Sequence, residues 1–311
     1  MSRRDDLAWA TPVDLPAELL ALGGAVRDGL GVGAAGKVGV LDLALAPVGG
    51  STKVIRQYQR APLHVYRPIH LDPVRPDMAF VFLQQQGDGL VQGDRYRIDV
   101  DCAPGSAVHL TTQASTKIFG ARDNFATQLV NLRVGAGAIL EYLPDPVVPF
   151  RGSRLFQRTC VTMARDATVV LGEILLPGRV AHDEAHVYDL YRSDTEVWAG
   201  GDLFFADTLR LRPGDVGDPG SPGMLGGYGI VATLHCVCPA VPPPELVASL
   251  RDALDEGPDV LVGVTELPGD RGATVRMLGH TSKAVHAAMR TAWHTLRIAV
   301  IGAPAPDLRK G

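Results

Sequence analysis

The sequence predicts a mainly β protein, and three features of its 311 residues lead to that prediction. Short apolar or alternating segments follow one another from residue 38 to residue 211, without segments of helical period between them. Turn residues are abundant, because the chain holds 35 glycines and 23 prolines. Helical periodicity returns only after residue 213. These features favour layered antiparallel sheets or a β-superhelix, with a small C-terminal segment of order β-α-β-β-α that holds two main helices.

Residues 1–37 are predicted to form a flexible glycine-rich N-terminal arm with a short helix over 15–30. Residues 31–36 match the dinucleotide fingerprint and, with Lys37, nearly match a phosphate-binding P-loop. Both motifs need a strand before the glycines and a helix after them. Here the order is reversed, and Val38 stands where the P-loop needs a hydroxyl. The sequence therefore argues against a nucleotide site.

Residues 38–212 are predicted to form a β-rich scaffold of short strands separated by Gly- and Pro-containing turns. The expected strands are 38–45, 54–59, 79–84, 95–100, 108–112, 128–134, 139–143, 156–163, 168–176, 185–192 and 203–211.

The stretch 141–150 interrupts this series with three prolines in six residues. Proline lacks an amide donor and has a fixed φ, so the stretch cannot sit in a helix or a central strand. We expect Glu141 and Tyr142 to end a strand. Asp145 is then held between two prolines on a rigid turn, where an acidic group suits a metal ion or an arginine.

Residues 213–311 are predicted to be a C-terminal α+β segment packed on the scaffold. A Gly/Pro-rich connection leads to strands over 228–238, 260–267 and 273–278 and to a helix over 244–256. Thr281 is expected to cap a second, long helix whose apolar stripe includes Val285, Met289, Ala292 and Leu296.

Composition narrows the class of protein. The net charge is −4 and no long basic run is present, which argues against a nucleic-acid partner. No apolar run reaches the length of a membrane span, and no secretory signal is recognisable at the start, so we expect a cytoplasmic protein that does not bind membranes. Four cysteines do not make a disulfide scaffold, and Cys236 and Cys238 are expected to pack in the core rather than bind a metal.

Several short motifs, in their order and spacing, carry a resemblance to a known family. They are Arg60-Ala61-Pro62-Leu63, Arg67-Pro68, Gly93-Asp94, Ala103-Pro104-Gly105, residues 111–117, Leu143-Pro144-Asp145-Pro146 with Pro149-Phe150, Gly172-Glu173-Ile174, Pro177-Gly178-Arg179, the Trp293-Leu296-Arg297 helix and the tail with Pro304, Pro306, Arg309 and Lys310. From about residue 38 to its end the chain resembles the urease accessory protein UreD family, also called UreH. It departs from that family's pattern at Gln92-Gly93-Asp94, where the family has Gly-Gly-Asp, and at Asp183-Glu184, where it has Gly-Glu.

The resemblance implies a non-enzymatic metallochaperone scaffold. Such a protein binds apo-urease and the accessory protein UreF, and through UreF the GTPase UreG, while nickel is delivered to the urease active site. It also implies a water-filled passage as the proposed nickel route, with nickel in transit and no tightly bound cofactor.

Carboxylates and histidines are the side chains that could carry nickel, because Ni²⁺ accepts both and scattered ligands release it readily. The candidates for a transient nickel path are Asp94, Glu141, Asp145, Glu173, His182, Asp183 and Glu184. Glu173 is flanked by apolar residues, so its carboxylate needs water or a partner, and a salt bridge to a buried arginine such as Arg179 is the alternative. His182 and its neighbour His186 are otherwise surface residues. The candidates for partner binding are Thr116, Lys117, Trp293, Arg297 and Arg309, the Trp293 helix being alternatively a core helix.

Two other functions stay open. The chain could be a structural wedge that recruits UreF and UreG to urease and never handles nickel. It could also be an uncharacterised hydrolase, since residues 111–117 offer hydroxyls and a lysine. That segment lacks the glycines of a nucleophile elbow, and no histidine is placed by sequence as its base, so we expect no catalysis.

Overall fold

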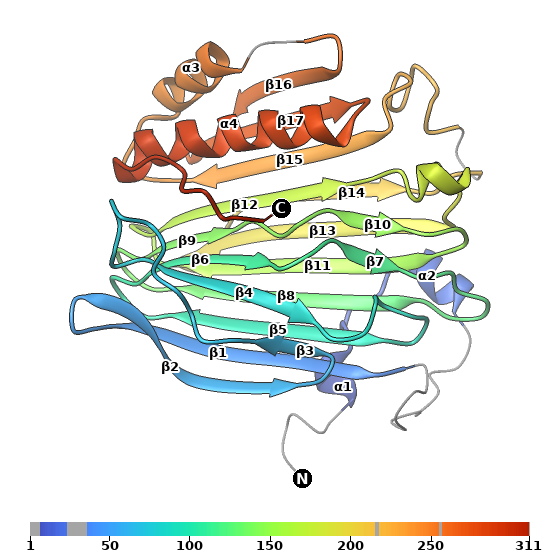
Figure 1. Cartoon of the computed structure of the whole chain (residues 1–311), viewed down its shortest axis with the longest axis horizontal. Helices are drawn as coiled ribbons and strands as arrows, with labels where there is room; N and C mark the ends of the chain where they lie inside the picture. The colour runs from blue at the N-terminus through green and yellow to red at the C-terminus, as the bar shows by residue number, and fades with distance from the viewer. Residues whose placement is uncertain (1–6, 24–35, 215–217, 255–256, 311) are drawn as a thin grey trace.

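The computed structural model describes residues 7–23, 36–214, 218–254 and 257–310 (Figure 1). The helices are α1 (Leu7–Ala10), α2 (Ala17–Leu22), α3 (Pro243–Ala253) and α4 (Ser282–Ile301). The strands are β1 (Val38–Val48), β2 (Ser51–Arg60), β3 (Leu63–Val65), β4 (Ala79–Gln85), β5 (Arg95–Cys102), β6 (Ala107–Thr112), β7 (Thr116–Ile118), β8 (Ala126–Val134), β9 (Ile139–Tyr142), β10 (Val147–Pro149), β11 (Arg154–Met163), β12 (Thr168–Leu175), β13 (Leu190–Ala199), β14 (Asp202–Leu211), β15 (Ile230–Val237), β16 (Val260–Glu266) and β17 (Gly272–Gly279). None of the described helices is long and apolar enough to span a membrane.

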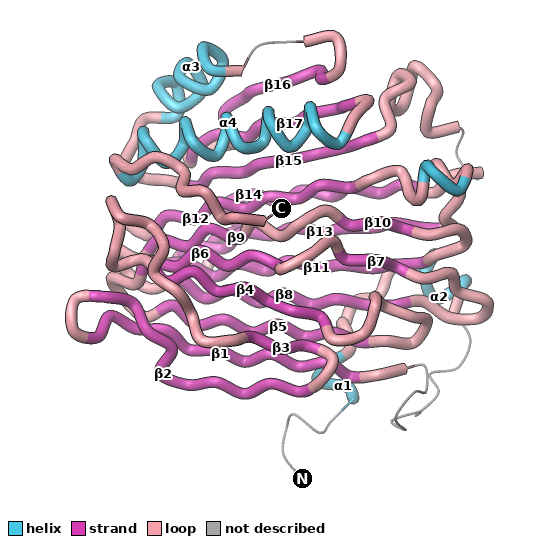
Figure 2. Tube along the Cα trace, viewed as in Figure 1, coloured by secondary structure: helices cyan, strands magenta, loops and turns pink. Residues whose placement is uncertain are grey.

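The strands form two stacked sheets, and the predicted mainly β class is confirmed. One sheet has seven strands in the order β14-β13-β11-β8-β5-β1-β2. The other has ten strands, and its main path runs β16-β17-β15-β12-β9-β6-β4-β3, with β10 and β7 beside it. Figure 2 shows the strands stacked as layers, with α3 and α4 gathered at the C-terminal end of the stack.

The central part of this stack is a β-superhelix, because the chain passes repeatedly from one sheet to the other. β5, β8, β11 and β13 lie parallel in one sheet, while β4, β6, β9 and β12 lie parallel in the other. The chain crosses from the first sheet to the second through residues 103–106, 135–138 and 164–167, three connections of equal length. Antiparallel strands flank the parallel coils, for example β2 and β14 at the two edges of the seven-stranded sheet.

Two apolar cores hold the layers together. The core between the sheets contains aliphatic rows that follow the parallel register, of which one is Leu43, Val100, Leu132, Val161 and Val197. The second core lies between the ten-stranded sheet and the two C-terminal helices. Burial of such rows removes apolar surface from water, which is the main favourable contribution to folding.

The C-terminal segment has the predicted β-α-β-β-α order and extends the ten-stranded sheet, since β15 pairs antiparallel with β12. The Thr281 hydroxyl accepts a hydrogen bond from the Ala284 amide at 3.3 Å and caps α4 as predicted. Gly302, with φ of 65°, ends that helix. Cys236 and Cys238 are buried free cysteines, which confirms their predicted place in the core.

One predicted strand is misplaced, because 185–192 is mostly loop and β13 runs from Leu190 to Ala199. Asp183 and His186 have positive φ, which breaks the extended chain before β13 begins. The residues that follow Arg192 are polar, so the rest of the strand lacks the alternation of apolar and polar residues that predicts a strand. Three strands of three residues each, β3, β7 and β10, are too short to show alternation in the sequence.

The predicted N-terminal arm is described only in part. Residues 24–35, which hold most of the glycine motif, lie outside the described residues. The described helix α2 is shorter than predicted and packs on the seven-stranded sheet, where Leu19 is fully buried beside Phe156 and Leu190. The Trp9 ring of α1 likewise lies 4.2 Å from the Arg97 guanidinium.

A buried ionic cluster joins α4 to the ten-stranded sheet. Arg297 donates from Nη1 to both carboxylate oxygens of Glu141, at 2.9 and 3.0 Å, and from Nη2 to Asp72. Its Nε donates to the Pro304 carbonyl at 3.0 Å. Glu141 also bonds His109 Nδ1 at 2.7 Å. At most 2% of each charged side chain is exposed, so each depends on its partners for solvation.

We predict that Arg297→Met destabilises the protein by ~3–5 kcal/mol, because the buried carboxylates of Glu141 and Asp72 lose their cation. The measurement is the free energy of unfolding in urea, with Arg290→Met, at an exposed position of α4, as the matched control. Equal stability of the two variants would contradict the prediction.

Candidate functional site

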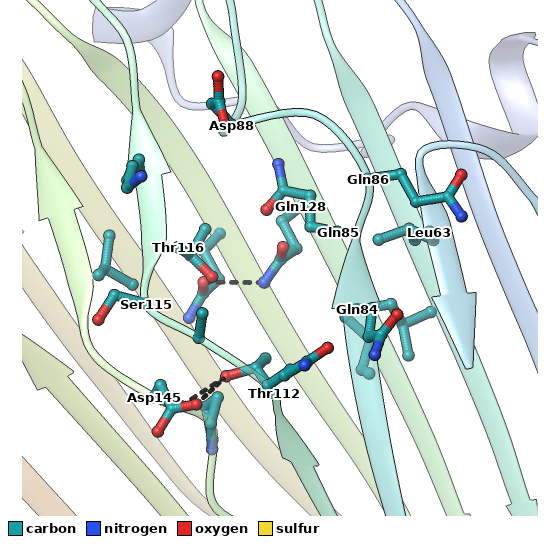
Figure 3. Close-up of a pocket in the computed structure, with 18 of the residues that line it drawn as sticks. Leu63, Gln84, Gln85, Gln86, Asp88, Thr112, Ser115, Thr116, Gln128 and Asp145 are labelled. Atoms are coloured by element: carbon teal, nitrogen blue, oxygen red, sulfur yellow. Dashed lines mark hydrogen bonds between the residues drawn. The ribbon is translucent and has the colours of Figure 1, made fainter. Parts of the chain in front are cut away.

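A cavity of about 450 Å³ with polar and apolar walls lies between the two sheets. Its walls come from β4 and the loop after it, from residues 112–117, and from β8, β11 and β12. Glutamine and hydroxyl side chains are numerous in its lining, and Figure 3 shows several of them around the cavity, among them Gln84, Gln85, Thr116 and Gln128. The sequence analysis proposed carboxylates and histidines for a water-filled passage and did not identify these glutamines as part of it.

Two of the cavity's glutamines, Gln128 and Gln157, belong to a polar row that crosses the seven-stranded sheet. The parallel register aligns Tyr96, Gln128, Gln157 and Ser193 on four neighbouring strands. Gln128 Nε2 donates to Gln157 Oε1 at 3.2 Å, and Gln157 Nε2 donates to Ser193 Oγ at 3.3 Å. This row lies four residues along the strands from the aliphatic row, so the space between the sheets turns from apolar to polar along its length.

Glu173 stands at the inner end of the polar row. It projects from β12 in the ten-stranded sheet and accepts hydrogen bonds across the gap, from Ser193 Oγ at 2.7 Å and from Tyr191 Oη at 2.6 Å. Burial raises its pKa above the ordinary value of 4.5, and the two hydroxyls act in the opposite direction. The alternative of a salt bridge to Arg179 is wrong, because Arg179 pairs with Glu184.

A second carboxylate, Asp207, lies close enough to Glu173 to act on its pKa. Asp207 on β14 lies 3.3 Å from His235 Nε2 on β15, and His235 Nδ1 lies 2.7 Å from the Thr274 hydroxyl. Asp207 also accepts from the half-exposed Arg276 at 2.7 Å. Its pKa is held well below the usual range by the hydrogen bond to His235 and by the neighbouring Arg276. None of these residues was a sequence candidate.

Asp145 lies at the rim of the cavity, on the proline-rich turn after β9. Its amide donates to Thr112 Oγ1 at 2.8 Å, and that hydroxyl donates back to Asp145 Oδ2 at 3.0 Å (Figure 3). Lys310 Nζ donates to the same carboxylate oxygen at 2.9 Å. The amide of Thr116 donates to the Pro146 carbonyl at 2.9 Å, which fixes residues 112–117 beside the turn.

The other predicted carboxylates are held by protein groups elsewhere. Asp94 is buried and accepts the backbone amides of Lys37 and Val91, at 2.8 and 3.0 Å, so it caps a turn. Glu141 belongs to the buried ionic cluster. Glu184 accepts from Arg179 at 2.7 and 2.8 Å, and this guanidinium lowers the pKa of its carboxyl to about 2.

The loop residues do not join the cavity wall either. His182 and Asp183 are exposed at the end of a short 3₁₀ turn, while His186 is half-buried and contacts Tyr188 Oη at 3.2 Å. Among the described residues, no group of three or more His, Cys, Asp or Glu side chains could hold a metal ion. Of the predicted nickel residues, the structure therefore brings Asp145 and Glu173 to one cavity.

The predicted partner-binding residues divide into two sets. Thr116 and Lys117 line the cavity near its rim, and Lys117 and Arg309 are exposed. Trp293 and Arg297 are buried against the ten-stranded sheet, the Trp293 ring lying 5.1 Å from that of His109. Both side chains pack in the protein interior, so this part of α4 is a core helix, as the alternative interpretation of the sequence predicted.

The raised pKa of Glu173 predicts a pH-dependent difference between the wild type and Glu173→Gln. The folded state holds this proton more tightly than the unfolded state, so the wild type loses stability relative to the variant as pH rises above about 4.5. The measurement is the urea midpoint of both proteins from pH 4 to pH 8. A constant difference across that range would contradict the raised pKa.

Comparison with known proteins identifies the family of this chain. A family model described as UreD urease accessory protein matches residues 37–310. The chain is 44% identical to urease accessory protein UreD 2 of Streptomyces griseus subsp. griseus, over 92% of this chain and 98% of that protein. It is 34% identical to UreD of Haloarcula marismortui, over 90% and 92% of the two chains, and 33% identical to UreD of Cenarchaeum symbiosum, over 90% and 99%. The chain therefore belongs to the UreD urease accessory protein family.

Proposed function

We propose that this chain is a non-catalytic cytoplasmic scaffold that binds apo-urease together with UreF, and UreG through UreF, and helps to deliver nickel to the urease active site. Nickel is the cargo in transit and no cofactor is tightly bound. Membership of the UreD family supports the accessory role. The cavity between the sheets supports the part that concerns nickel.

The observation that carries this proposal is the pair of carboxylates along one cavity. Asp145 at the rim and Glu173 at the inner end offer hard oxygen ligands, and the amides and hydroxyls between them suit the water ligands of a hydrated cation. Two separated carboxylates bind a divalent cation weakly, as a delivery protein requires. His235 and Asp207 lie near Glu173 and place further polar groups close to the inner end of the cavity.

The wedge function remains the second candidate, and one observation favours it. Asp94, Glu141 and Glu184 are each satisfied by protein partners, so these carboxylates hold the fold together without needing a cation. A scaffold that only recruits UreF and UreG to urease would use them in the same way.

Removing the cavity charges separates the two functions. We expect Asp145→Asn and Glu173→Gln, alone and combined, to leave complex formation intact while the nickel content of co-expressed urease falls at least severalfold. The measurements are pull-down of apo-urease and UreF with the variant, and metal analysis of the purified urease. Glu266→Gln, at an exposed position of β16, is the matched control. Full nickel loading in the double variant, with a normal complex, would leave only the wedge.

Substitution of the exposed residues Lys117 and Arg309 tests whether the surface near the cavity rim binds a partner protein. We expect Lys117→Glu and Arg309→Glu to weaken pull-down of UreF or apo-urease without changing the urea midpoint, because both side chains are exposed. Lys283→Glu at the exposed start of α4 is the control. If Lys117→Glu and Arg309→Glu bind UreF and apo-urease as well as the Lys283→Glu control and the wild type do, this surface is not a docking site.

A further inference from the structure

The last residues of the chain form a strap that lies across the ten-stranded sheet. The C-terminal strap, residues 303–310, leaves α4 at Gly302 and runs over the outer side of that sheet (Figure 1). At its start the Pro304 carbonyl accepts from Arg297, and the Ala305 amide donates to His294 Nδ1 at 3.4 Å. Further on, Leu308 packs on an apolar cluster that includes Met78 and Phe80.

The strap ends in a cation that contacts the acidic rim of the cavity. Lys310 Nζ donates to Asp145 Oδ2 at 2.9 Å and to Thr111 Oγ1 at 2.6 Å. About a fifth of each charged side chain is exposed, 21% for Lys310 and 19% for Asp145. The ammonium therefore places one positive charge and two hydrogen bonds on oxygen atoms that a metal ion would use.

The strap lines a second cavity next to the first. Leu308, Arg309 and Lys310 contribute to this cavity of about 440 Å³, which has Gln84 and Gln113 in common with the cavity between the sheets. The strap therefore lies beside the space that leads to Asp145.

We propose that Lys310 is the resident counter-ion of a displaceable cation site formed by Asp145 and the hydroxyls of Thr111 and Thr112. The proposal rests on the function inferred for the cavity and adds its regulation. A divalent cation that binds Asp145 displaces the Lys310 ammonium, and the end of the strap leaves the sheet. Cation binding and release of the strap are then coupled equilibria. Binding of the cation favours release of the strap, and release of the strap raises the affinity for the cation by the same factor.

The contacts of the strap make this exchange feasible. Among the described residues, positions 304–310 form no backbone-to-backbone hydrogen bond with a strand, so side chains hold the segment in place. Segments with few buried contacts and few ladder bonds open at low free energy. The Lys310 pair is partly exposed, and such ion pairs contribute little to binding. A doubly charged ion is therefore able to compete with a single ammonium for Asp145.

The test uses the full chain and Ni²⁺ alone as the probe, with affinity measured by calorimetry. We expect Lys310→Gln to bind Ni²⁺ about two- to fivefold more tightly than the wild type, because the competing charge is gone. Lys310→Arg keeps the charge and should bind like the wild type. Asp145→Asn should bind more weakly, and adding Lys310→Gln to it should change nothing further.

A second measurement reads the strap itself. Hydrogen exchange of residues 303–310 should speed up when Ni²⁺ is added to the wild type and should not respond in Asp145→Asn. One outcome refutes the displacement of Lys310 but keeps the proposed function of the cavity. In that outcome Glu173→Gln weakens Ni²⁺ binding, Lys310→Gln binds Ni²⁺ like the wild type, and hydrogen exchange of the strap does not respond to Ni²⁺. If no cavity variant changes Ni²⁺ binding or urease nickel content, the proposed function fails as well.

Discussion

The contact of Arg297 with Glu141 and Asp72 is the constraint that fixes the C-terminal helix α4 on the ten-stranded sheet. It places a guanidinium from α4 against a carboxylate at the end of β9 and another from the segment before β4. Buried charges of this kind contribute little net stability but allow few alternative arrangements, since each must keep its partners. The position of α4, and with it the start of the C-terminal strap, follows from that geometry.

The parallel register explains how one scaffold contains both a dry core and a wet cavity. Register places equivalent positions of neighbouring coils side by side, so each inward row repeats one chemical character across the sheet. The row from Leu43 to Val197 is aliphatic and closes the space between the sheets. The row with Gln128, Gln157 and Ser193 is polar, and its hydrogen bonds lead to Glu173. A change of residue type at one row position therefore alters the cavity without altering the path of the chain.

Much of the fold could be predicted from the sequence, because alternation and turn residues report directly on strands and their ends. The cap at Thr281 and the strand end at Tyr142 are examples of local signals that the structure confirms. The site was harder to predict, since an acidic residue looks the same in a sequence whether water or an arginine solvates it. Glu141 and Glu173 lie in similar apolar surroundings, yet one pairs with Arg297, 156 residues away, and the other with hydroxyls of the opposite sheet. Only contacts with segments that are distant in the sequence distinguish them.

The ionic cluster forms late during synthesis, because its residues are far apart in the sequence. Neighbouring coils of the superhelix are close in sequence, so they can pair as the chain emerges from the ribosome. Arg297 meets Glu141 and Asp72 across 156 and 225 residues. Until Arg297 is made and α4 packs on the sheet, both carboxylates lack the cation that the folded interior gives them. The nascent scaffold therefore stays incomplete at this layer until α4 has been synthesised.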